Sequence, residues 1–66
     1  MEFRIKQLRK ERGMSQTELA RRAGVSRQTI ILLESGVAKN TTTRTIAGIA
    51  DALDTTADAL FYDQSV

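Results

Sequence analysis

The side chains best placed for chemistry lie on one face of a short amphipathic segment: Arg27, Gln28, Ile31 and Leu32. At about 100° per residue, Arg27 and Gln28 fall in the first turn of the outward face, and the two aliphatic residues follow in the second turn. A planar cation and a carboxamide beside apolar groups can bind another molecule through hydrogen bonds and van der Waals contacts. The set holds no nucleophile and no general base, so its chemistry is recognition.

The composition removes most catalytic and metal-binding chemistry. The sequence contains no histidine and no cysteine, which excludes the commonest general base, thiol nucleophiles, thiolate metal ligands and disulfides. The acidic residues do not form a defined carboxylate pair of the kind that general acid–base catalysis needs. We therefore expect no enzyme activity, no catalytic residue, no metal and no cofactor.

Charge is distributed unevenly along the chain. All ten Lys and Arg residues and four of the eight acids lie at or before Arg44, which gives that part a net charge of +6. The other four acidic residues are Asp51, Asp54, Asp58 and Asp63, and they give the part after Arg44 a net charge of −4. This asymmetry suits a protein whose first part meets a polyanion. A helical surface of mixed charge is the alternative explanation.

Length predicts a single domain, residues 1–66, with a small core. A chain of this size buries only about 60% of the surface that its unfolded form exposes, so its stability depends on close helix packing or on oligomerisation. No apolar run approaches the ~18 residues of a membrane span, and the first residues lack the apolar core of a signal peptide. We expect a cytoplasmic protein with no membrane partner.

The spacing of apolar residues predicts a compact all-α domain of five short helices joined by short loops. The expected helices cover residues 5–12, 16–23, 27–34, 43–53 and 57–61. Gly48 inside the fourth helix weakens it by roughly 1 kcal/mol relative to alanine, so we expect it to permit the close approach of a neighbour. Phe3 and the pair Phe61 and Tyr62 are candidates for a minor two-stranded ribbon.

A serine or threonine precedes each of the later helices, where its hydroxyl can accept a hydrogen bond from a free first-turn amide: Ser15, Ser26, Thr42 and Thr56. Residues 15–18 have the spacing of a capping box, in which Glu18 also reaches back to the Ser15 amide. Gly24 ends the second helix, and we expect Met14 and Val25 to turn back into the core. The second and third helices are thereby joined by a tight turn.

This pattern resembles the Xre/Cro-type, phage-repressor-like helix-turn-helix family of transcriptional regulators. The resemblance covers roughly residues 4–61 and rests on Leu8-Arg9, Ser15-Gln16-x-Glu18-Leu19-Ala20, Ala23-Gly24-Val25-Ser26, Ile30-x-x-Leu33-Glu34-x-Gly36, Ile46-x-x-Ile49-Ala50-x-Ala52-Leu53 and Asp58-x-Leu60-Phe61. It implies a repressor-like fold whose third helix lies in the major groove of DNA. One departure is Asp54, which stands where glycine is common.

The resemblance implies roles for the exposed residues. In the major groove, Arg27 can bond O6 and N7 of guanine, and Gln28 can bond N6 and N7 of adenine. Ile31 and Leu32 could touch thymine methyl groups, although two adjacent exposed aliphatics suit a protein contact equally well. Contacts with phosphate are expected from the start of the second helix and from neighbouring residues: Gln16, Thr29, Arg21, Arg22, Lys39 and Arg44.

The resemblance also implies how the third helix is held and what the protein does. Arg9 and Glu34 match a pair that forms a salt bridge between the first and third helices of relatives. We expect a sequence-specific repressor that binds a near-palindromic operator as a homodimer. The two copies would meet through the fourth and fifth helices, with Phe61 and Tyr62. The alternative is a protein-interaction adaptor or an antitoxin-type module, which would use the same fold to dock a partner protein.

Overall fold

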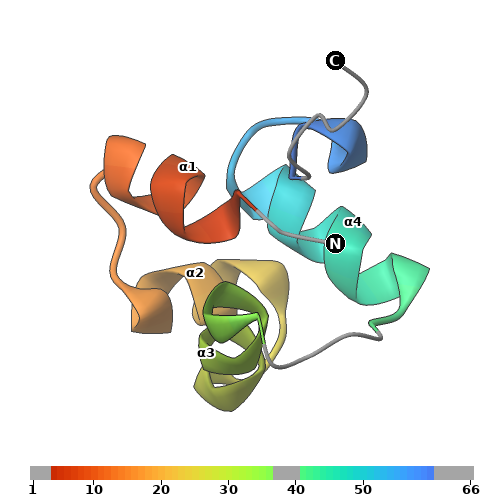
Figure 1. Ribbon diagram of the computed structural model, residues 1–66, viewed down its shortest axis with the longest axis horizontal. Helices are drawn as coiled ribbons and strands as arrows, with labels where there is room; N and C mark the ends of the chain where they lie inside the picture. The colour runs from red at the N-terminus through yellow and green to blue at the C-terminus, as the bar shows by residue number, and fades with distance from the viewer. Residues whose placement is uncertain (1–3, 37–40, 61–66) are drawn as a thin grey trace.

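The computed structural model describes residues 4–36 and 41–60. Four α-helices follow one another in this part, and a 3₁₀ helix ends it: α1 (Ile5–Glu11), α2 (Gln16–Ala23), α3 (Arg27–Ser35), α4 (Thr43–Ala52) and η1 (Ala57–Leu60). Figure 1 shows α3 beside α2 at one edge of the molecule, with η1 at the opposite edge. The all-α prediction is confirmed. None of the helices in these ranges is long and apolar enough to cross a membrane.

The prediction of a fifth α-helix is wrong. Residues 57–60 form one 3₁₀ turn, in which the Ala59 amide donates to the Thr56 carbonyl at 3.1 Å. A segment this short closes too few α-helical hydrogen bonds to offset the cost of nucleating an α-helix. Phe3, Phe61 and Tyr62, the candidates for a ribbon, lie outside the described residues. Next to them, the Arg4 amide donates to the Leu60 carbonyl at 2.6 Å.

The predicted caps of α2, α3 and α4 are confirmed. Their hydroxyl oxygens accept hydrogen bonds from the amide three residues later, at 3.0 Å for Ser15, 3.2 Å for Ser26 and 3.1 Å for Thr42. The second half of the expected capping box is wrong, because the Glu18 carboxylate accepts hydrogen bonds from Arg21 and Arg22 instead of returning to Ser15. Two cations one turn away attract the carboxylate more strongly than a neutral amide does.

Left-handed backbone at the last turn closes α2 and α4. Gly24, with φ +74°, lets the Val25 amide donate to the Ala20 carbonyl at 3.0 Å, and Val25 packs against the core as expected. Asp54 adopts φ +56° and allows the same closing bond, here from Thr55 to Ala50 at 2.9 Å. This bond pattern is the Schellman motif, which normally has glycine at the left-handed position. Asp54 thus adopts the left-handed conformation for which glycine is the common residue, and the closing hydrogen bond still forms.

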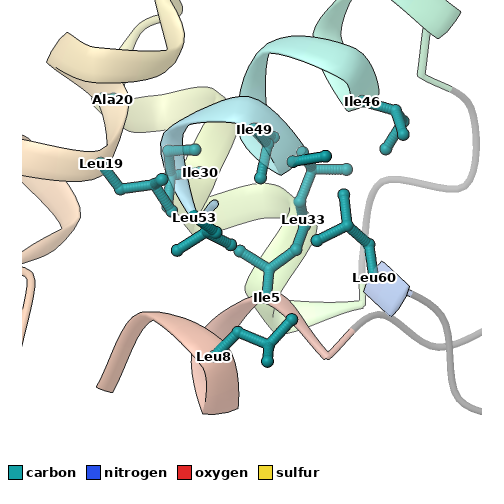
Figure 2. Packing of buried hydrophobic residues seen from close by; sticks show 11 residues of the cluster. Ile5, Leu8, Leu19, Ala20, Ile30, Leu33, Ile46, Ile49, Leu53 and Leu60 are labelled. Atoms are coloured by element: carbon teal, nitrogen blue, oxygen red, sulfur yellow. The ribbon is translucent and has the colours of Figure 1, made fainter. Parts of the chain in front are cut away.

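One core joins the five elements. Figure 2 shows buried side chains converging on a single centre from α1, α2, α3, α4 and η1. The set consists of Ile5, Leu8, Leu19, Ala20, Ile30, Leu33, Ile46, Ile49, Ala50, Leu53 and Leu60. Because α3 contributes Ile30 and Leu33 to this centre, its rotation about its own axis is fixed.

Gly48 lies where α4 crosses the end of α2. A Cβ atom added at Gly48 would stand 2.7 Å from the backbone oxygen of Ala23, closer than real Cβ atoms approach. The prediction that this glycine permits a close approach is therefore confirmed. The obstructing atom belongs to the backbone and cannot rotate away as a side chain would.

Replacing Gly48 with alanine is expected to lower the free energy of unfolding by about 1–3 kcal/mol, because the overpacked crossing must move apart. The change would otherwise stabilise α4 by about 1 kcal/mol through helix propensity. Urea denaturation followed by circular dichroism measures the difference. Ala47→Gly on the exposed side of α4 is the matched control, with an expected loss of about 1 kcal/mol from propensity alone. A Gly48→Ala variant that gains stability would show that the helices do not meet this closely.

Candidate nucleic-acid interface

The first turn of α3 presents two polar side chains to the outside. Arg27 and Gln28 are exposed, and within the described ranges neither side chain makes a hydrogen bond or an ion pair. Ile30 and Leu33 on the inner face are 0% and 2% exposed. Since the core holds the inner face, the guanidinium and the carboxamide are directed away from the protein. Both groups are free to form two parallel hydrogen bonds with a planar partner.

The second turn of α3 continues the outward face with aliphatic side chains. Ile31 and Leu32 are half-buried, less exposed than the helical wheel alone suggests. Neither belongs to the buried cluster. The surface of α3 thus changes from hydrogen-bonding groups at its N-terminal end to partly covered apolar groups one turn later.

A buried ion pair ties α3 to α1. Arg9 Nε donates to Glu34 Oε2 at 2.7 Å, and Arg9 Nη2 donates to Glu34 Oε1 at 3.1 Å. The two side chains are only 10% and 5% exposed. The remaining terminal nitrogen of Arg9 donates to the Met14 carbonyl at 2.8 Å, in the link between α1 and α2. A parallel two-bond geometry fixes the guanidinium and the carboxylate in one plane, so the pair constrains how α3 lies on α1.

Gln16, at the start of α2, joins this pair. Its Nε2 atom donates to Glu34 Oε1 at 3.1 Å. We refer to Arg9, Gln16 and Glu34 together as the Arg9–Glu34 cluster. Nothing in the sequence pattern pointed to the Gln16–Glu34 bond or to the Met14 carbonyl as a partner of Arg9, because both depend on the path of the link before α2. A carboxamide nitrogen carries two hydrogens, so one remains for a ligand beside the α2 N-terminus.

Arg21 and Arg22 share one carboxylate on the surface of α2. Arg21 Nη2 lies 2.6 Å from Glu18 Oε2, and Arg22 Nε bonds the same oxygen. The hydrogen bond from Arg22, followed by the one from Arg21, holds the pKa of Glu18 below its usual value. The two arginine side chains remain 70% and 52% exposed. The group therefore keeps an excess positive charge at the surface.

The other residues expected to contact phosphate are placed differently. The Thr29 hydroxyl lies 3.0 Å from the Ser26 hydroxyl, so it takes part in the cap of α3. Arg44 is exposed in the first turn of α4 and has no ion-pair partner among the described residues. Lys39 lies outside the described residues. The structure thus brings Gln16 together with Glu34, and Arg21 with Arg22, but it leaves Arg44 on a separate helix.

Known proteins resemble this chain in sequence over its central part. The profile of the helix-turn-helix family matches residues 5–60. A curated protein from Methanothermobacter thermautotrophicus, described as an uncharacterized HTH-type transcriptional regulator, is 62% identical over 32 residues, which is 48% of this chain and 46% of that protein. The chain spans about half the length of the curated relatives it matches.

Solved structures resemble the chain over most of its length. The restriction-modification controller protein C.AhdI from Aeromonas hydrophila is 34% identical, with a TM-score of 0.82 over 88% of this chain and 86% of that one. The N-terminal DNA-binding domain of SinR from Bacillus subtilis is 32% identical, with a TM-score of 0.84 over 96% of this chain and 91% of that domain. The SinR chain solved in complex with DNA is 34% identical, with a TM-score of 0.79 over 83% of this chain and 87% of that one. From α1 to η1, then, sequence and fold agree, and the chain belongs to the helix-turn-helix family of Xre/Cro-type transcriptional regulators.

Proposed function

We propose that this domain binds double-stranded DNA and regulates transcription, with α3 inserted in the major groove. The observation that carries the proposal is the position of Arg27 and Gln28, which are exposed together in the first turn of a helix whose other face is anchored in the core. Helix-turn-helix proteins meet base edges with these first-turn residues. SinR, which is similar in fold, has been solved with DNA, and the family is one of DNA-binding regulators rather than enzymes.

In this proposal, Arg27 bonds a guanine and Gln28 bonds an adenine, while Ile31 and Leu32 lie against the next base pair. Positioning on the phosphates comes from the free hydrogen of the Gln16 carboxamide and from the exposed arginines Arg21, Arg22 and Arg44, with Thr29 and Lys39 as further candidates. The Arg9–Glu34 cluster keeps α3 at the angle that the groove requires.

We also propose that the domain acts as a homodimer on a near-palindromic operator, and that it represses by covering the promoter. Two base-contacting side chains, Arg27 and Gln28, distinguish few base pairs. A two-fold pair of α3 helices about one DNA turn apart doubles the number of base pairs that are recognised. Asp51, Asp54 and Asp58 are exposed on the α4–η1 side, and DNA would repel them, so this side should face away from DNA and remain accessible to a second copy. Phe61 and Tyr62, proposed for the same contact, lie outside the described residues.

Replacing Gln28 with alanine is expected to weaken binding to the preferred operator by about 1–3 kcal/mol and to relax the preference at one base pair. Arg22→Ala is the matched control, because a lost phosphate contact weakens every sequence to a similar degree. An operator is first selected from random duplex DNA. Fluorescence anisotropy then gives affinities for that duplex and for its single-base-pair variants. An equal loss on every duplex from Gln28→Ala would exclude its role as a reader.

Salt dependence separates this function from that of a protein-docking adaptor. Phosphate contacts release counterions, so the logarithm of the affinity for DNA should fall linearly and steeply with the logarithm of salt concentration. An adaptor that meets DNA only incidentally would bind weakly and show little slope. Titration of random and selected duplexes over a range of KCl concentrations measures both cases.

A further inference from the structure

We infer that Ile31 and Leu32 make the domain a reader of the C5-methyl group of pyrimidines, so that it responds to thymine and to 5-methylcytosine in the same way. The inference rests on the proposed function, because it requires α3 to lie in the major groove. It adds a ligand chemistry to that function: a methyl group whose presence on cytosine would change affinity at an otherwise unchanged sequence.

Placement on the helix supports the inference. Ile31 follows Arg27 by four residues and Leu32 follows Gln28 by four, so each aliphatic side chain stands one turn behind a polar reader on the same face. Their neighbours Ile30 and Leu33 already supply the contribution of α3 to the core. Ile31 and Leu32 keep part of their surface exposed, on the face of α3 that also carries the exposed Arg27 and Gln28.

The chemistry of the groove then decides what this surface can meet. An aliphatic side chain pressed against the amino group of adenine or cytosine, or against the acceptors of guanine, removes water and offers no hydrogen bond in return. A C5-methyl group is the one apolar feature of the major groove, and its contact with Ile31 or Leu32 carries no such penalty. The methyl group of 5-methylcytosine is attached to the same ring carbon as that of thymine.

The test uses the wild-type protein first. On a duplex selected from random DNA, each thymine of a half-site is replaced in turn by deoxyuridine, which lacks only the methyl group. Each cytosine of the half-site is likewise replaced by 5-methylcytosine. In further duplexes, each thymine position carries first cytosine and then 5-methylcytosine, and the two affinities are compared. At one or two neighbouring positions we expect deoxyuridine to weaken binding about fourfold and 5-methylcytosine to strengthen it about fourfold over cytosine. This factor corresponds to about 0.8 kcal/mol per buried methyl-sized group.

Variants then assign the effect to residues. Ile31→Ala and Leu32→Ala should bring the thymine-to-deoxyuridine affinity ratio close to one at the position each contacts. Arg27→Ala should weaken binding to both the thymine and the deoxyuridine duplex, while the ratio of the two affinities stays at about four. Thermal unfolding of each variant shows that it is folded at the assay temperature, and the wild-type comparison needs no variant at all.

Two results would overturn the inference while leaving the proposed function intact. The first is sequence-specific binding in which methyl removal has no effect at any position, as expected if Ile31 and Leu32 serve a protein contact. The second is a fourfold ratio that persists in the Ile31→Ala/Leu32→Ala double variant, which would assign the methyl contact elsewhere. Failure to select any specific duplex would instead reject the proposed function, and the inference with it.

Discussion

Glu34→Ala is expected to remove about 3–5 kcal/mol from the free energy of unfolding, because it leaves the Arg9 guanidinium buried without a counter-charge. The Arg9 side chain is only 10% exposed, and it loses two hydrogen bonds to the carboxylate. Small domains have total stabilities of roughly 5–15 kcal/mol, so a substantial fraction of this variant should be unfolded at physiological temperature. Urea denaturation followed by circular dichroism measures the loss, and DNA binding should decline with it.

Two controls separate burial from pairing as the cause. Glu18→Ala removes a carboxylate that also meets two arginines, but on the surface, where solvent screens the charges, so it should cost much less stability than Glu34→Ala. The double variant Arg9→Met/Glu34→Leu removes both buried charges and should recover most of the stability lost by Glu34→Ala alone. Equal stabilities for Glu34→Ala and Glu18→Ala would show that the Arg9–Glu34 pair is no better shielded from water than a surface pair.

Leu53→Ala should lower the free energy of unfolding by about 2–5 kcal/mol, through lost burial and the cavity left behind. Leu53 is 0% exposed and belongs to the buried cluster that Figure 2 shows. Leu32→Ala is the matched control, since it makes the same chemical change at a half-buried position outside the cluster. Thermal and urea unfolding of both variants, at equal protein concentration, measures the difference.

The two leucine variants also separate stability from recognition. Leu53→Ala should impair DNA binding only to the extent that it unfolds the domain, and saturating DNA should restore part of its thermal stability by mass action. Leu32→Ala should remain folded while its discrimination of the methyl group falls. Similar losses of stability in the two variants would mean that Leu32 belongs to the core, which would remove the basis for its role in the groove.

Local chemistry explains why the helix boundaries could be predicted from the sequence. Ser15, Ser26 and Thr42 each precede a helix whose free amides need an acceptor, and Gly24 provides a backbone conformation that most residues avoid. Such signals act over a few residues, so they are legible without tertiary information. The core residues followed from helical periodicity for the same reason.

The details that sequence did not reveal depend on competition between partners. Glu18 can bond the Ser15 amide or the two arginines, and only the folded geometry decides in favour of Arg21 and Arg22. Gln16 could direct both amide hydrogens outward, yet it donates one to Glu34 across the interface between α2 and α3. The 3₁₀ form of η1 was also missed, because the sequence signals that place a short helix after Thr56 do not distinguish 3₁₀ from α hydrogen bonding over four residues.

The hydrogen bond from the Arg4 amide to the Leu60 carbonyl has a consequence for engineering. It holds the first and last described residues of the helical unit against each other, at the edge where Figure 1 places η1, away from α3. Residues 4 and 60 therefore lie together on the side of the domain away from α3. Two copies of the domain could accordingly be joined by a flexible linker at these ends, and the resulting single chain would bind two half-sites.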